Sequence, residues 1–129
     1  MSNRYKTYEQ LAPQKKPENS RSRVIPAISP DMANALIIDR NHKFSIVDIF
    51  ATWCSPCMTF KPKFEEMSLN YPHIRFISID INNEEFANSQ YTSDVTVVPT
   101  FKIFESGQLK NVLAGSSEEE IKEILTSLK

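Results

Sequence analysis

The sequence predicts an α/β domain in which a central mixed β-sheet is flanked by helices. Two nearly continuous apolar runs, 44–50 and 74–81, have the aromatic and branched residues of strands that are covered on both faces. A helical pattern between them predicts a right-handed crossover with parallel strands. Two more strand patterns, 100–104 and 109–114, flank a Gly-containing turn and are expected to pair antiparallel. The expected order of elements is βαβαβαββα.

The other elements follow from start and stop signals along the chain. Residues 24–28 are expected to form a short strand. Ser29-Pro30-Asp31 then combines an N-cap residue, a proline for the first turn and an early acid, so a helix is expected from there to about residue 40. The next helix is expected to begin near Cys54 and to end near Asn70, ahead of a proline.

Two helices remain for the second half of the chain. A short polar helix is expected around 84–90. Ser116 and Ser117 are each followed by a glutamate three residues later, and either can form the capping box of a final helix. That helix has a helical apolar spacing at Ile121, Ile124, Leu125 and Leu128.

Length and composition indicate one domain with an extension before it. The chain has 129 residues, of which 40% are hydrophobic and 24% charged, as in a globular protein with one core. Residues 1–22 have scattered charges, two prolines and no hydrophobic period, so we expect a flexible extension there and a single domain over 23–129. The net charge of −1 gives no reason to expect nucleic acid or an anionic membrane as a partner.

The expected location is the cytoplasm. No apolar run is long enough to cross a bilayer, and residues 1–25 lack the continuous apolar segment of a secretory signal. The alternative is an organelle, with the extension as a transit peptide, because basic residues outnumber acidic ones in this part of the chain. The basic residues are Arg4, Lys6, Lys15, Lys16, Arg21 and Arg23, against Glu9 and Glu18.

Cys54 and Cys57 are the only two cysteines, and they form a C-x-x-C pair. This spacing occurs in zinc and iron–sulfur sites as well as in dithiol enzymes. A closed zinc site needs four ligands, and His42 and His73 stand at the far ends of their elements from the pair, where we expect each to be a solvated loop residue. We therefore expect redox chemistry and no metal.

The position of the pair favours thiol chemistry. Cys54 follows a buried strand and stands where a helix begins, and the unpaired N–H groups of a helix start stabilise a thiolate. We expect Cys54 to be the nucleophile and Cys57, one turn into the helix, to resolve the mixed disulfide. Pro56 fits the first turn and stiffens the loop.

Asp48 interrupts the apolar strand that leads to the cysteines. Burial disfavours the ionised carboxylate, so the proton should stay bound near neutral pH. This suits a general base for Cys57, and the alternative is a hydrogen-bonded structural aspartate. For Pro99, base rates favour a trans peptide bond before the proline. Trp53 is either a core aromatic or a half-exposed cover for the site.

These motifs together resemble the thioredoxin family over about residues 23–129. The features are the segment WCSPC, an aspartate six residues before its first cysteine, a proline five residues after its second, and V-P-T some forty residues later. The resemblance implies the thioredoxin fold, with Cys54 attacking, Cys57 resolving and Asp48 assisting it. It also implies that Pro62 kinks the active-site helix and that Pro99 is a cis-proline facing the dithiol.

The resemblance further implies a flat apolar docking surface around the cysteines, in which the backbone of Val98 pairs with an extended segment of the substrate. Its members are Trp53, Ile81, Val98, Ala114 and Gly115. The sequence departs from the family pattern at Ser55, where glycine is usual, and at Phe50, where a second tryptophan is common.

The function implied is reduction of protein disulfides by dithiol–disulfide exchange. The resemblance implies disulfide-containing protein substrates, no bound cofactor, and a Cys54–Cys57 disulfide that an external thioredoxin reductase or its equivalent recycles. We expect a monomer. The alternatives are an oxidase or isomerase of secreted proteins, and a non-catalytic binding module in which the cysteines are incidental.

Overall fold

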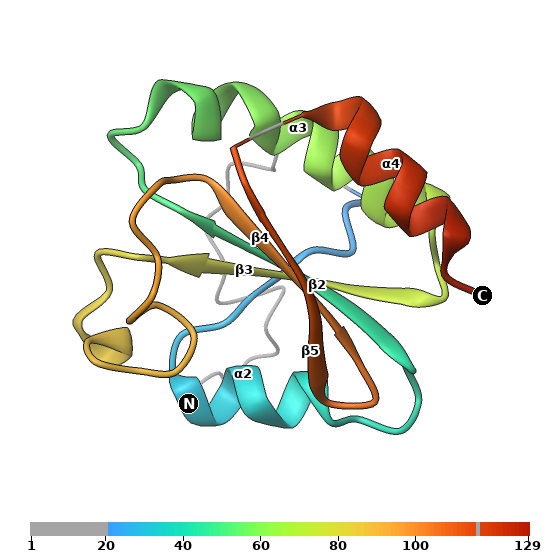
Figure 1. Cartoon of the computed structure of the whole chain (residues 1–129), viewed down its shortest axis with the longest axis horizontal. Coiled ribbons are helices and arrows are strands. Elements are labelled where there is room, and N and C mark those ends of the chain that lie inside the picture. The colour runs from blue at the N-terminus through green and yellow to red at the C-terminus, as the bar shows by residue number, and fades with distance from the viewer. Residues whose placement is uncertain (1–20, 116) are drawn as a thin grey trace, which may run out of the picture.

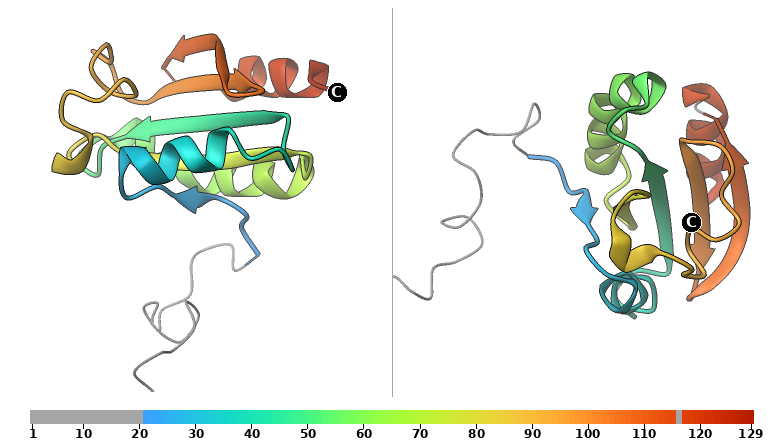
Figure 2. Two further views of the ribbon diagram at one scale, coloured as in Figure 1. Left: turned by 90° about the horizontal axis from the view of Figure 1, so that it is seen from below. Right: turned by 90° about the vertical axis from the view of Figure 1, so that its left-hand side faces the viewer.

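The computed structural model describes residues 21–115 and 117–129, and within them a single five-stranded mixed sheet. Its strands are β1 (Ile25–Pro26), β2 (Phe44–Phe50), β3 (Ile74–Asp80), β4 (Thr100–Glu105) and β5 (Gln108–Ala114). They lie in the order β1-β3-β2-β4-β5, which Figure 2 shows with β1 in blue at one edge. The first three strands run parallel, whereas β4 is antiparallel to β2 and to β5. The predicted α/β class and mixed sheet are confirmed.

Within the part of the chain that the structure describes, three helices cover the sheet. Helices α3 (Ser55–Asn70) and α4 (Glu118–Ser127) lie on one face, and α2 (Pro30–Ile37) lies on the other (Figure 1). The caps follow the sequence signals, since the hydroxyls of Ser29 and Ser117 accept hydrogen bonds from the backbone N–H groups of Met32 and Glu120. The other proposed cap, Ser116, lies outside the described residues.

Three predicted boundaries were wrong. The first strand is limited to Ile25–Pro26, because after the last ladder bond, from the N–H of Ala27 to the carbonyl of Ser78, the chain turns into the N-cap of α2 at Ser29. Helix α2 ends at Ile37, and the side chain of Asp39 then closes a turn by accepting a hydrogen bond from the N–H of Asn41. The helix expected over 84–90 is only a 3-10 turn, η2 (Glu84–Phe86), because Asn88 adopts a left-handed backbone with φ of 61°.

The core has two halves, one on each side of the sheet. Under α3 and α4, Phe101 of β4 packs against Phe60 and Phe64, with ring centroids 5.2 and 5.8 Å apart. Under α2, buried residues of β2 and β3 pack with the helix and with the segment after β3; they include Ala33, Ile37, Val47, Ile77, Phe86 and Tyr91. Since β2 is buried on both faces, its position at the centre of the sheet is fixed, and so is the place where its chain emerges.

The end of β2, the end of β3 and the start of β4 lie together at one edge of the molecule. The carboxyl ends of the parallel strands β2 and β3 lie at the same edge of the sheet (Figure 1). Strand β4 runs the other way and therefore begins there, with Thr100 paired to Ile49 near the end of β2. In the described residues, no helix combines the length and apolar character needed to span a membrane.

Candidate active site

Cys54 and Cys57 form a disulfide at the start of α3, with their Cα atoms 5.2 Å apart. Cys54 is the N-cap residue, and its sulfur accepts a hydrogen bond from the backbone N–H of Cys57 at 3.2 Å. Ser55 and Pro56 occupy the exposed first turn between them. The predicted place of the pair, where a buried strand gives way to a helix, is confirmed.

The geometry at this helix start favours negative charge on the sulfur of Cys54. The N–H of Cys57 points at that sulfur, and the positive end of the helix lies behind it. Pro56 costs the helix no hydrogen bond in its first turn. Pro62 lies inside α3, where it cannot donate the usual backbone hydrogen bond to Met58.

Asp48 is a buried carboxyl group in the middle of β2. Burial raises the pKa of Asp48 to about 7. Among the described residues no donor forms a hydrogen bond to its Oδ1 atom.

The face on which Asp48 lies follows from the alternation of side chains along β2. Phe44 and Ile46 pack with Phe60 of α3, and the residue two positions after Ile46 points to the same face. Cys57 is buried at the start of the helix that covers this face. The carboxyl group and the inner cysteine thus belong to the same side of the sheet.

The segment before β4 faces the disulfide. The Val98–Pro99 bond is cis, so the prediction from base rates was wrong and the geometry implied by the family resemblance is confirmed. The sulfur of Cys54 lies 3.6 Å from the carbonyl oxygen of Val98. The N–H of Gly115 donates a hydrogen bond to the carbonyl of Pro99 at 2.8 Å, which brings the end of β5 to the same place.

The side chains expected to form a docking surface have different exposures. Trp53 is 70% exposed, so it is not a core residue, and its indole N–H donates to Asn82 at 2.8 Å. Ile81 and Val98 are half-buried against the cysteines. Ala114 is exposed, and Gly115 has a φ of 93°, with no atom of the described residues other than its chain neighbours within 4 Å of where a Cβ would lie. The surface beside the disulfide is therefore open to an incoming chain.

Two further residues of this surface, Val97 and Asn82, were not predicted from the sequence. Val97 is 49% exposed and directly precedes Val98, and an apolar pair just before a proline was the available signal. Asn82 orients Trp53, but no local pattern links two residues that are 29 positions apart.

The two histidines lie away from the disulfide. His42 precedes β2 and is half-buried, with its Nδ1 atom 3.0 Å from the guanidinium of Arg75, so its description as a solvated residue was wrong. His73 is exposed and bonds to the carbonyl of Leu128. Across residues 21–115 and 117–129, no group of three His, Cys, Asp or Glu residues is arranged to hold a metal ion.

Comparison with known proteins gives a consistent result. The thioredoxin family profile matches residues 28–127. Thioredoxin-2 of Pyricularia oryzae is 31% identical over 88 residues, which are 68% of this chain and half of that protein. Thioredoxin 1 of Plasmodium falciparum is 34% identical over 69% of this chain and 83% of its own length.

Comparison with solved structures also finds thioredoxins. The X-ray structure of Fasciola hepatica thioredoxin superposes with a TM-score of 0.72 at 28% identity, covering 81% of this chain and 99% of that one. The family match and the Cys54–Cys57 disulfide of this chain support thiol–disulfide exchange through a redox-active disulfide, with no bound cofactor. The chain therefore belongs to the thioredoxin family and is a thiol–disulfide oxidoreductase.

Proposed function

We propose that the protein reduces disulfides of other proteins, with Cys54 as the nucleophile and Cys57 as the resolving thiol. The observation that carries this proposal is the placement of the pair, in which the sulfur of Cys54 caps a helix and lies 3.6 Å from the Val98 carbonyl. The Cys54 thiolate attacks one sulfur of the substrate disulfide. The substrate S–S bond breaks, a mixed disulfide forms, and the leaving thiolate takes up a proton.

Cys57 completes the reaction. Its thiol loses a proton and attacks the sulfur of Cys54, which forms the internal disulfide and releases the second substrate thiol. Asp48 is the proposed acceptor of that proton. A group with a pKa of about 7 is half-deprotonated near neutral pH, which suits a general base.

The docking surface holds the substrate over the sulfur. We assign Trp53, Val97 and Val98 to contact with the substrate, together with Ile81, Pro99, Ala114 and Gly115 around them. Exposed apolar side chains beside an open backbone segment suit an extended chain around a disulfide, because such a chain has backbone groups to pair and apolar side chains to bury.

Each turnover leaves the protein oxidised, so a partner must return two electrons and two protons to the disulfide. We propose a thioredoxin reductase or its equivalent for this step, and a role for the protein in electron transfer and in cellular thiol balance. A monomer in the cytoplasm is the proposed state, and size-exclusion chromatography and localisation of a tagged full-length chain test it.

The chemical roles are tested by insulin reduction with Cys54→Ser and Cys57→Ser. Both variants should lose turnover. Only Cys57→Ser should accumulate a stable mixed disulfide with its substrate, detected by mass, because Cys54 can still attack while nothing resolves the product. Trapping by Cys54→Ser instead would reverse the two roles, and unchanged turnover in both variants would indicate a binding module.

The direction of the reaction is tested by the reduction potential of the Cys54–Cys57 couple. The oxidised chain is equilibrated with graded glutathione buffers, and the dithiol fraction is read by alkylation and mass. A potential well below that of glutathione supports a reductase, and a potential well above it assigns the protein to the oxidases or isomerases.

A further inference from the structure

Lys102 is an ammonium group buried in the middle of the sheet. It lies on β4 between Val47 of β2 and Val112 of β5, and its side chain is only 3% exposed. Its alternation along β4 places it with Phe104 on the face that α2 covers, away from the face of Asp48. A buried ammonium requires close partners, because loss of hydration is costly.

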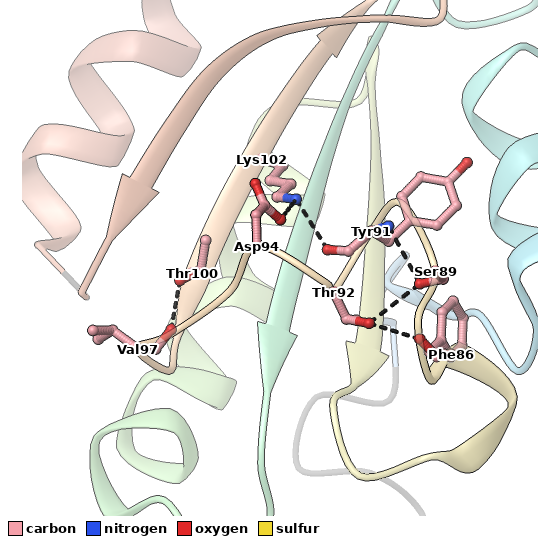
Figure 3. A network of polar contacts seen from close by, with 8 residues as sticks. All are labelled: Phe86, Ser89, Tyr91, Thr92, Asp94, Val97, Thr100 and Lys102. Atoms are coloured by element: carbon pink, nitrogen blue, oxygen red, sulfur yellow. Dashed lines mark hydrogen bonds and ion pairs between the residues drawn. The ribbon is translucent and has the colours of Figure 1, made fainter.

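The two hydrogen bonds of this ammonium both go to the loop that precedes β4. Lys102 donates to the carbonyl of Tyr91 at 3.0 Å and to the carboxylate of Asp94 at 2.7 Å (Figure 3). The side chain of Asp94 is 60% exposed, so the loop supplies the partner while the sheet supplies the buried charge. The hydrogen bond from Lys102 lowers the pKa of Asp94, and the carboxylate stays ionised through the neutral range.

The loop held in this way is the one that carries the docking surface. Residues 87–99 connect η2 to β4 without a helix or strand, and they end in the segment Val97-Val98-Pro99. The start of the loop is fixed by the buried ring of Tyr91, which packs against Phe86 and Phe104. Its end is fixed by the hydroxyl of Thr100, which donates to the carbonyl of Val97 at 2.6 Å (Figure 3).

Asp94 lies between these two anchors, four residues before Val98. Its bond to Lys102 joins the middle of the loop to β4, an interior strand of the sheet. We propose that the Lys102–Asp94 pair positions Val97 and Val98 beside the disulfide and so sets the affinity for protein disulfides, without a part in the sulfur chemistry. This inference rests on the proposed reductase function and assigns Lys102 and Asp94 as positioning residues.

The test compares two disulfides that need the docking loop to different degrees. Insulin has peptide backbone on both sides of each of its disulfide cysteines, whereas the small aryl disulfide dithionitrobenzoate has no backbone to pair with Val98. Lys102→Met keeps the length and apolar character of the side-chain stem and removes the ammonium, and with it the hydrogen bonds to Tyr91 and Asp94. Asp94→Asn keeps an acceptor oxygen at an exposed position and removes only the charge.

We expect Lys102→Met to raise the KM for insulin by about fivefold or more, as for loss of a charge-assisted hydrogen bond. Asp94→Asn should raise the KM for insulin less than Lys102→Met does. Asp94→Glu keeps the charge, so its KM for insulin should lie between those of the wild type and Asp94→Asn. The kcat for insulin and the rate with the aryl disulfide should remain unchanged. Amide exchange over residues 95–98 should become faster in Lys102→Met, as expected if the pair restrains this segment.

The matched control is Lys43→Met, which removes an exposed lysine paired with Glu105 at 3.7 Å near the β4–β5 turn. It should leave the KM for insulin and the rate with the aryl disulfide unchanged. An unchanged insulin KM in Lys102→Met overturns the inference, and so does an equal loss of rate with both disulfides. If Lys102→Met does not fold, Asp94→Asn carries the same test. A wild-type chain that reduces neither disulfide overturns the proposed function, whereas failure of the inference alone leaves wild-type reduction intact.

Discussion

The buried carboxyl group of Asp48 should make the stability of the oxidised protein depend on pH, and Asp48→Asn should remove that dependence. The pKa of this group rises from an ordinary 3.8 to about 7 on folding because the carboxyl is buried. The folded protein therefore holds the proton more tightly than the unfolded chain. The free energy of unfolding should fall as the pH rises from about 4 to about 7 and then level off.

The magnitude follows from the size of the shift. A rise from 3.8 to about 7 corresponds to about 4 kcal/mol, at about 1.4 kcal/mol for each pKa unit. Asparagine has nearly the same shape and no charge to bury. Asp48→Asn should match the wild type near pH 4 and should be more stable by up to about 4 kcal/mol at pH 8.

The assay is urea denaturation of both oxidised proteins at several pH values between about 4 and 8, with the slope checked to be constant between them. Glu85→Gln is the matched control, because it removes one carboxylate from an exposed position and should change stability by less than about 0.5 kcal/mol at every pH. A difference between Asp48→Asn and wild type that is the same at all pH values would refute the reasoning. A less stable Asp48→Asn protein at pH 8 would refute it as well.

Three further predictions follow from the same structure. In single-turnover insulin reduction, Asp48→Asn should slow resolution by Cys57 about tenfold or more, while attack by Cys54 keeps its rate. The inflection near pH 7 in the pH–rate profile of resolution should disappear, and an inflection that persists would assign the proton transfer to another group. Phe101→Ala should cost about 3 kcal/mol or more in urea denaturation, because the ring is fully buried against two aromatic neighbours. Ser117→Ala should cost about 1 kcal/mol through loss of the α4 cap, with turnover unchanged, whereas a loss near zero would mean that solvent replaces the cap.

Much of the fold and of the candidate site could be predicted from local patterns. Consecutive residues are enough to identify the apolar runs of β2 and β3. They are also enough to show that Asp48 interrupts the first of these runs. The boundary errors occur where a single side chain or backbone angle outweighs the pattern, as at Asp39 and at Asn88. Lys102 interrupts an apolar strand just as Asp48 does, so the signal for a special role was present there too.

The sequence by itself determined that two cysteines stand at the start of a helix after a buried strand, because strand burial, helix capping and their spacing are local. Tertiary structure alone decided what faces them. The position of the Val98 carbonyl, the orientation of Trp53 by Asn82 and the hold of Lys102 on Asp94 all join segments that lie apart in the sequence. Such contacts form only when packing brings loops to one edge of the sheet, and no local propensity specifies which partner a buried charge or an exposed ring will meet there.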